Sequence, residues 1–374
     1  MSLTAPAPDI SARDIDARSS TAATVAAWTE VSPHDLSLWN GVLLDSDTSL
    51  YQYPYWNEPY RRLRLTPRYL ALGTSERPIA FVSILTVGFG KMKVGLVFRG
   101  PASLVRGEQL CLAAVRGLLD WARAQGYIFI RFTHSDALVL TYLAVAGHAE
   151  NFDAFPYFLD YPVLSPDYII DQSDDDERTL AGFDREVRRK IRRATEAGYE
   201  FFPEDSPEAL AKQWPLYEDC ARRKQFRLER PLSFYMQTIR LARPHNCVRL
   251  YSVLLQGRVV GSTLIFRDGL TAHCQLAALE AHHRQAAVFL HWHAMRDMYR
   301  LGARRYNLGP APGSLARFKR QFCQHPLTYP GPLTVVLREN SFRIWWKFLF
   351  PLAKRFRPVL RKIVSQLEAL TPTE

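Results

Sequence analysis

The chain has 374 residues, 47% of them hydrophobic, and a formal net charge of +11. This length exceeds the usual size of one hydrophobic core, so we expect two domains, and the apolar content excludes an intrinsically disordered protein. The positive charge favours partners such as nucleic acid, an anionic membrane face or a phosphorylated substrate.

The cysteines and the N-terminus indicate the compartment. No Cys-x-x-Cys pair occurs among Cys111, Cys220, Cys247, Cys274 and Cys323. Such scattered cysteines are typical of a reducing compartment. Residues 1–20 lack the basic and apolar regions of a secretory signal, and no window reaches the roughly 18 apolar residues of a membrane span. We expect a cytoplasmic protein, with peripheral contact to the inner face of the membrane as a further option.

The first half of the chain predicts one α+β module. Residues 1–23 read as a disordered tail, because few of them could repay their ordering entropy by burial. Apolar periodicity then predicts helices and short alternating strands, which together indicate an antiparallel meander with helices on its faces. The predicted helices are 35–44, 56–63, 110–124 and 138–145, and the predicted strands are 69–72, 79–86, 94–98 and 127–132. We assign residues 24–160 to this module.

The second half repeats the same order of elements. A helix is predicted from the acidic run 174–177 to Ala197, where Gly198 ends it. Further helices are predicted at 207–223, 233–241 and 287–301, and strands at 248–255, 259–266, 270–279 and 304–308. We therefore predict two tandem modules of related α+β fold, the second over 161–338, followed by a basic aromatic helical tail over 339–374.

Three segments carry a resemblance to a known family. They are Arg304–Gly309 with Arg317–Phe322, the basic run Phe183–Ala194, and Tyr51–Trp56 with Phe98–Pro101. In this order and spacing they resemble the Fem peptidyltransferases, a branch of the GNAT acyltransferase superfamily. The resemblance implies GNAT-like modules that move an aminoacyl group from aminoacyl-tRNA to an amine of a peptide or cell-envelope precursor, without a metal, a cofactor or a covalent intermediate.

Lys319 is the predicted catalytic residue. Acyl transfer to an amine passes through a tetrahedral oxyanion, which a positioned cation in a water-poor site stabilises. The resemblance assigns this role to Lys319 and the stacking of the terminal tRNA base to Phe318, and Phe322 is a further candidate contact. The alternative is that Phe318 and Phe322, at i and i+4, are core residues of an amphipathic turn.

The basic run 183–194 predicts an amphipathic helix with a phosphate clamp. Arg188 and Arg192 share one face, and guanidinium groups bind phosphate oxygens bidentately. The resemblance places the diphosphate of the acceptor, a phosphorylated or lipid-linked peptide, in this region. The alternative is a solvated face paired with nearby carboxylates.

Two further positions concern the acceptor. The resemblance would place a binding lysine about four residues after Trp56, where this chain has Tyr60. Either a muropeptide nucleotide is not the acceptor, or the contact passes to Arg61 or Arg62. Trp56 is a candidate contact or a core residue. Asp136 follows a predicted strand and could accept the proton of the attacking ammonium, or cap the next helix.

The donor loop and the tail complete the predictions. GNAT enzymes usually bind coenzyme A with a glycine-rich loop, but residues 284–290 lack those glycines, so acyl-CoA is the less favoured donor.

The mixture of aromatic and cationic residues over 341–363 is typical of an interfacial membrane anchor, or of a helix packed on the catalytic module.

Two rival functions stay open. One is acylation of an exopolysaccharide or small amine from acyl-CoA or acyl-carrier protein. The other is a non-catalytic tRNA- or membrane-binding protein. For the enzyme we expect a pocket between the modules, in which the buried ammonium group of Lys319 faces the reacting carbonyl.

Overall fold

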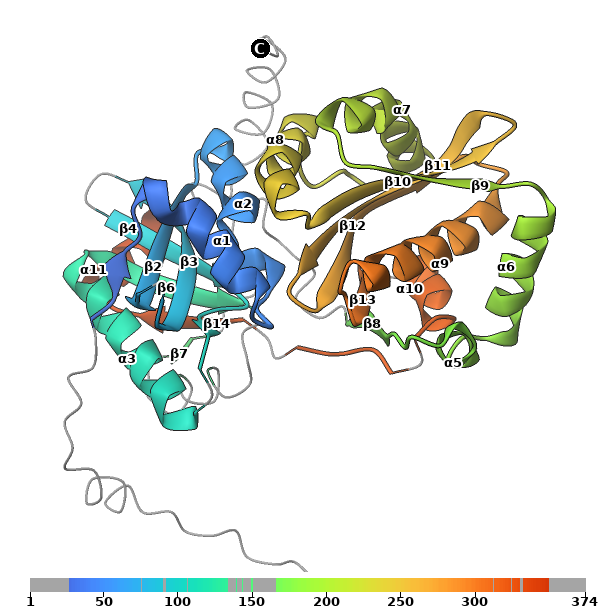
Figure 1. Cartoon of the computed structure of the whole chain (residues 1–374). Helices are drawn as coiled ribbons and strands as arrows, with labels where there is room; N and C mark the ends of the chain where they lie inside the picture. Colours follow the sequence, from blue (N-terminus) through green and yellow to red (C-terminus); the bar gives the residue numbers. More distant parts are fainter. Residues whose placement is uncertain are drawn as a thin grey trace, which may run out of the picture.

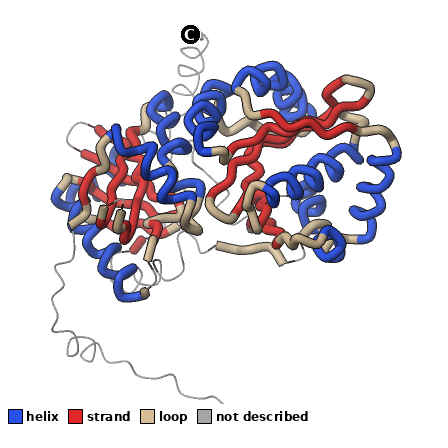
Figure 2. The backbone as a smooth tube through the Cα atoms, in the orientation of Figure 1, coloured by secondary structure: helices blue, strands red, loops and turns tan. Residues whose placement is uncertain are grey.

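Two modules of sheet and helix lie side by side along the chain (Figure 1; Figure 2). Both sheets are mixed and flanked by helices, so the predicted α+β class is confirmed. The computed structural model describes residues 27–74, 76–89, 92–105, 107–133, 139, 143, 149–150, 166–311, 313–323, 325–329 and 332–349. Asp136 lies outside these ranges, and so does the predicted helix at 138–145 except for Val139 and Leu143.

The first module is built on a sheet with the strand order β1-β2-β3-β4-β6-β14-β7, with β5 paired to β3. Its strands are β1 (Thr29–Glu30), β2 (Thr66–Gly73), β3 (Pro78–Phe89), β4 (Met92–Phe98), β5 (Ala102–Ser103), β6 (Tyr127–Thr133), β7 (Ala149–Glu150) and β14 (Leu333–Val336). Its helices are α1 (Leu36–Leu44), α2 (Pro54–Asn57), α3 (Glu108–Ala124) and α11 (Glu339–Ile344). Helix α3 packs by the apolar stripe that includes Val115, Leu118 and Ala122.

The second module has the strand order β8-β13-β12-β11-β10-β9. Its strands are β8 (Asp167–Asp171), β9 (Glu200–Glu204), β10 (Val248–Leu255), β11 (Arg258–Asp268), β12 (Thr271–Leu279) and β13 (Arg305–Pro310). Its helices are α5 (Asp176–Ala181), α6 (Arg185–Glu196), α7 (Pro207–Arg223), α8 (Leu232–Ala242), α9 (Arg284–Arg300) and α10 (Gly313–Arg320).

The two modules share one pattern of connections. In each, three strands pair antiparallel as a meander, a helix crosses over the sheet, and the next strand pairs parallel to the last strand of the meander. The parallel pairs are β4 with β6 after α3, and β12 with β13 after α9. This order is the tandem repeat that the sequence predicts.

The structure corrects the predicted boundary at residue 338. Strand β14 pairs antiparallel with β6, with Val335 opposite Ile130, so the chain returns to the first sheet before that residue. The physical reason is the open edge of β6, which gains a partner and covers its unpaired backbone groups. Helix α11 follows on the same module, where the ring of Phe342 contacts that of Phe129.

The predicted single helix over 174–197 is also wrong. The chain leaves helical geometry between α5 and α6, where Phe183 is buried against Trp292 and Phe322. The amide of Asp184 donates to the carbonyl of Gln321 instead of continuing the helix. Burial of one aromatic ring therefore interrupts the helical periodicity.

The modules share a hydrophobic core. Trp56 of α2 meets Phe234 of α8 and Phe266 of β11 edge to face, with ring centroids 5.7 and 5.4 Å apart. Residues of α1, α2 and β2–β4 belong to the same buried cluster as residues of α7, α8, β10 and β11. The boundary around Trp56 is thus filled by apolar side chains, and the pocket that we expect between the modules does not open there.

Candidate functional site

The parallel strands β12 and β13 separate after three residue pairs. Pairing runs from Thr271 with Arg305 to His273 with Asn307, and the two strands then diverge. Gly309 lies in β13 beyond this point with φ of +75°, a conformation that glycine adopts without steric cost. The separation exposes backbone carbonyls of β13 that the sheet does not satisfy, and they must find other donors.

Lys319 of α10 supplies those donors. Its Nζ donates to the carbonyl oxygens of Leu308 at 2.5 Å, Gly309 at 3.1 Å and Pro310 at 3.0 Å. The side chain is 8% exposed, and burial lowers the pKa of its ammonium group. Three carbonyl acceptors require three N–H groups, which only the charged ammonium form carries. The structure therefore places a buried positive charge at the end of β13.

Aromatic rings surround this charge. Phe318 is half-buried and contacts Phe322 and His291, with ring centroids 5.3 and 6.1 Å apart. Phe322 is buried in the core, so in this conformation it supports Phe318 and offers no surface to a ligand. Burial, with a contribution from the charge of Lys319, lowers the pKa of His291 to about 3, so this imidazole is neutral and bonds to the hydroxyl of Tyr306 at 3.0 Å.

A polar network connects the Lys319 turn to the first module. Asn307 accepts the amide of Gly309 on its Oδ1 at 2.6 Å and donates through Nδ2 to Asp167 at 2.8 Å. Asp167 in turn pairs with Arg99. On the next strand, His273 Nε2 lies 2.6 Å from the carboxylate of Asp268, which also accepts the amide of Leu50 at 2.6 Å. These buried contacts fix the end of β13 against both modules.

Arg188 and Arg192 lie on the exposed face of α6, while Val187 and Ile191 are buried beneath it. Figure 1 places α6 at the end of the second module that is remote from the first module. Arg61 lies in the first module and pairs with Glu58, with 2.8 Å between Nε and Oε2. The structure therefore does not bring Arg61 together with Arg188 and Arg192, and one phosphate of the acceptor cannot contact all three side chains.

Trp56 is fully buried in the shared core, which favours the packing role over a ligand contact. The cation beside it is Arg230, which no sequence motif indicated. Its Nε and Nη2 donate to the hydroxyl of Tyr60 at 3.0 and 2.8 Å, and its guanidinium lies 5.2 Å from the centroid of the Trp56 ring. Arg230 thus brings a positive charge to the position where the family resemblance expects a lysine. One sequence signal could have indicated such a cation, namely the absence of a lysine at position 60. A phosphate contact there would need a cation from elsewhere in the chain.

The start of α9 is the segment that the family resemblance compares with the GNAT donor loop. Ala286, Ala287 and Val288 are buried, so their side chains occupy the space that glycines would leave open. The N-cap residue His283 makes no side-chain capping bond, and its ring contacts Tyr199 and Glu280 instead. A carboxylate next to this helix terminus disfavours a pyrophosphate there.

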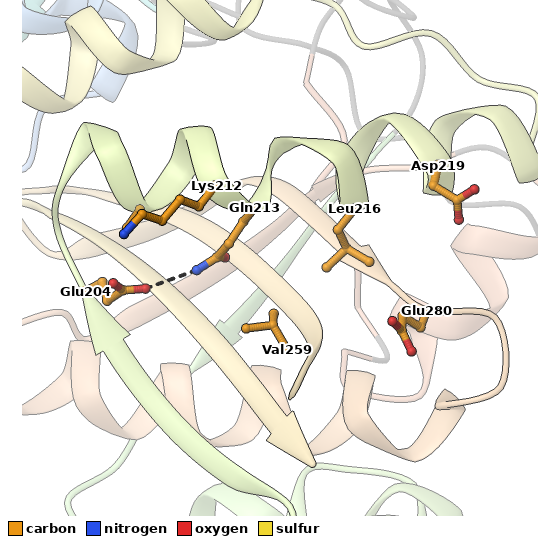
Figure 3. A pocket seen from close by; sticks show the side chains of 8 residues that line it. Glu204, Lys212, Gln213, Leu216, Asp219, Val259 and Glu280 are labelled. Atoms are coloured by element: carbon orange, nitrogen blue, oxygen red, sulfur yellow. Dashed lines mark hydrogen bonds between the residues drawn. The ribbon is translucent and has the colours of Figure 1, made fainter. Parts of the chain in front are cut away.

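A cavity of about 470 Å³ lies between α7 and the sheet of the second module (Figure 3). Gln213 points into its centre and bonds to Glu204 at 3.0 Å and to Ser252 at 2.7 Å. Asp219 and Glu280 lie on the opposite side from Glu204, and Lys212 is at the rim. This acid-rich cavity is lined by residues other than those of the Lys319 site.

Comparison with known proteins shows which folds the chain is similar to. A family model described as the acetyltransferase (GNAT) domain matches residues 181–320. The crystal structure of FemX superposes with a TM-score of 0.70 at 14% identity, over 85% of this chain and 99% of that chain. L-PGS from Bacillus licheniformis gives a TM-score of 0.54 at 14% identity, over 88% and 99% of the two chains.

A third structure is the C-terminal domain of a putative lysylphosphatidylglycerol synthetase from Agrobacterium fabrum. It gives a TM-score of 0.51 at 15% identity, over 83% of this chain and 96% of that domain. No curated protein matches the sequence. Residues 181–320 of the second module thus match a GNAT domain model, and the chain as a whole has a fold similar to that of FemX, in agreement with the resemblance of the sequence motifs.

Proposed function

We propose that this GNAT protein is a Fem-type aminoacyltransferase, which moves an aminoacyl group from aminoacyl-tRNA to an amine of a peptide or cell-envelope precursor. The observation that carries the proposal is the buried ammonium of Lys319 at the point where β12 and β13 separate. A fixed positive charge in a water-poor site suits a reaction that develops negative charge on a carbonyl oxygen.

The proposed chemistry balances without a cofactor. The neutral amine of the acceptor attacks the ester carbonyl of aminoacyl-tRNA and forms a C–N bond. The tetrahedral intermediate carries the charge on its oxygen, close to Lys319. When it collapses, the C–O bond to the ribose breaks, and the ribose oxygen takes the proton that the amine loses. The products are an amide and deacylated tRNA.

Lys319 can meet the oxyanion by exchanging one hydrogen bond. Its bonds to Gly309 and Pro310 are longer than that to Leu308, so one of them is the bond to be replaced. Phe318, which is half-buried beside it, is the candidate to stack on the terminal base, since every base presents a π-face.

The basic face of α6 supports a donor that is a nucleic acid. Arg188 and Arg192 are exposed there, and Arg317 and Arg320 are exposed on α10, the helix that carries Lys319. The amide of Asp184, which precedes α6, bonds to the carbonyl of Gln321 just after α10, so the two helices are joined at these ends. We assign these cations to phosphates of the donor tRNA. This replaces the predicted acceptor-phosphate role of Arg188 and Arg192.

For the acceptor, Arg230 is the candidate cation. It reaches the hydroxyl of Tyr60 at the boundary between the modules, while Glu229 neutralises part of its charge at 3.2 Å. One structural neighbour is named as a lysylphosphatidylglycerol synthetase. That name is consistent with an aminoacyl group and a phosphate-bearing acceptor on this fold.

A second candidate is acyl transfer from acyl-CoA, because the matching family model is described as an acetyltransferase domain. The buried side chains at 286–288 and the carboxylate of Glu280 are the features that disfavour it.

Donor competition separates the two candidates. The purified protein is incubated with a primary-amine peptide and either labelled aminoacyl-tRNA or labelled acetyl-CoA. The proposal predicts label on the peptide from aminoacyl-tRNA only, and its loss when the tRNA is first digested with ribonuclease. Transfer from acetyl-CoA that survives ribonuclease would establish the second candidate instead.

A further inference from the structure

The end of the described chain presents an apolar face to solvent. Ile344 of α11 and Phe348 of the π-helical turn Trp345–Leu349 are 53% and 68% exposed, and Trp346 is 36% exposed. Large apolar side chains usually lie in the core, and these three fall within five consecutive residues.

Two buried aromatic residues pack the same helix against the first module. Phe342 and Trp345 are buried, and the ring of Trp345 lies 5.0 Å from that of Phe129 in β6, edge to face. The amide of Phe342 bonds to the carbonyl of Arg338 at the start of the helix. The exposed side chains are therefore carried by a helix that is packed on the first module.

Positive charge accompanies the exposed apolar residues. Arg343 and Lys347 are exposed on the same helix, and only Arg343 has an ion pair among the described residues, with Glu339 at 3.0 Å. The sequence beyond the described residues continues this composition, with Lys354, Arg355, Arg357, Arg361 and Lys362 before the next carboxylate, Glu368.

We propose that this helix face, defined by Arg343, Ile344, Trp346, Lys347 and Phe348, is an interfacial docking site for an anionic lipid bilayer. The apolar side chains enter the boundary between headgroups and acyl chains, and the cations contact lipid phosphates. Charge complementarity selects this occupant, because a second copy of the face would bring like charges together. Among the described residues, the helices are too short or too polar to span a bilayer.

The test uses the full-length chain and sedimentation with vesicles. At about 0.1 M salt we expect the protein to bind vesicles of phosphatidylcholine with one third phosphatidylglycerol at least tenfold more tightly than pure phosphatidylcholine. The double variant I344S/F348S should lose at least tenfold in binding to the anionic vesicles. The matched control is L38S/L110S, which replaces two leucines exposed elsewhere on the first module and should bind as the unchanged protein does.

Two results would overturn the proposal. One is equal vesicle binding by I344S/F348S and by the control, which would assign any binding to the remaining cations of the C-terminus. The other is a concentration-dependent dimer that I344S/F348S abolishes, with no binding of the unchanged protein to anionic vesicles, which would show that a second copy covers this face. Thermal unfolding of both variants checks that the fold is intact.

Discussion

Arg99 of the first module and Asp167 of the second form an ion pair across the boundary, with 2.5 Å between Nη2 and Oδ2. Their side chains are 13% and 4% exposed. Burial alone would raise the pKa of Asp167, but the charge and hydrogen bond of Arg99, with a hydrogen bond from Asn307, hold it below its usual range. Since Asn307 also fixes Gly309, the ion pair supports the turn that holds Lys319.

Removing one partner of this pair should destabilise the fold strongly. Arg99→Met leaves the Asp167 carboxylate buried beside the neutral donors Asn307 and Tyr329, and we expect a loss of about 3–5 kcal/mol in the free energy of unfolding. The double variant R99M/D167N removes the uncompensated charge and should recover at least ~1 kcal/mol of that loss. Urea unfolding at pH 7 measures both, and equal stability of the single variant and the unchanged protein would contradict the role of the pair.

The buried His291 should make the protein sensitive to mild acid. Its pKa is about 3 in the folded state, against 6.5 for a free imidazole, so between these values the unfolded state binds more protons. The free energy of unfolding must then fall as pH drops below about 6.5, by roughly 2 kcal/mol at pH 5 from this group alone.

His291→Gln removes this titration and can still bond to Tyr306. Urea unfolding at pH 7 and pH 5 should show a smaller loss for the variant than for the unchanged protein, by that same amount. Identical losses in the two proteins would mean that His291 is not held neutral by burial.

Charge reversal on α6 should weaken RNA binding selectively. For the double variant R188E/R192E we expect at least a tenfold loss of tRNA affinity at 0.1 M salt, with the salt dependence reduced by roughly two phosphate contacts. A matched reversal of exposed arginines in the first module, R77E/R116E, should change affinity by less than about threefold. Filter binding over a salt series measures both, and equal losses would indicate a diffuse charge effect.

The return of the chain to the first sheet predicts the effect of truncation. A chain that ends at residue 331 lacks β14 and the buried rings of Phe342 and Trp345, so β6 keeps β4 but loses its second partner strand. Burial of the two rings alone is worth about 3–6 kcal/mol, and its loss should lower the unfolding midpoint of the first module. A chain that ends at residue 349 keeps these contacts and serves as the control.

Hydrogen exchange of the β6 amides reports this directly. They should exchange much faster in the shorter chain than in the control. Unchanged protection in both chains would contradict the pairing of β14 with β6.

Local patterns predicted most elements of the second module. The strand over 248–255 and the helix over 207–223 have the predicted bounds, because alternation and amphipathic spacing act within a few residues. The pairing of β14 with β6 joins segments about two hundred residues apart, and a strand of four residues carries no signal of its partner. Similarly, the burial of Phe183 interrupts the helix over 174–197 that the sequence pattern predicts as continuous.

The site was predictable in its residue types and less so in its contacts. The motif around Lys319 indicated a cation among aromatic rings, and the structure buries it there. The three groups that accept hydrogen bonds from Lys319 are backbone carbonyls, and a pattern of side chains does not predict such contacts. Arg230 reaches Tyr60 from another module, so only the tertiary fold reveals that contact.

The most direct measurement is the turnover number for aminoacyl transfer from aminoacyl-tRNA by Lys319→Met, corrected for the folded fraction from an unfolding curve. The variant keeps the length of the side chain and removes its charge, so a group that stabilises the oxyanion should cost at least 100-fold in kcat, with the KM for aminoacyl-tRNA changed by less than about threefold. Lys319→Arg keeps the positive charge in a different geometry, so its kcat should lie between that of Lys319→Met and that of the unchanged protein. Turnover by folded Lys319→Met equal to that of the unchanged protein would show that the buried ammonium only ties the end of β13.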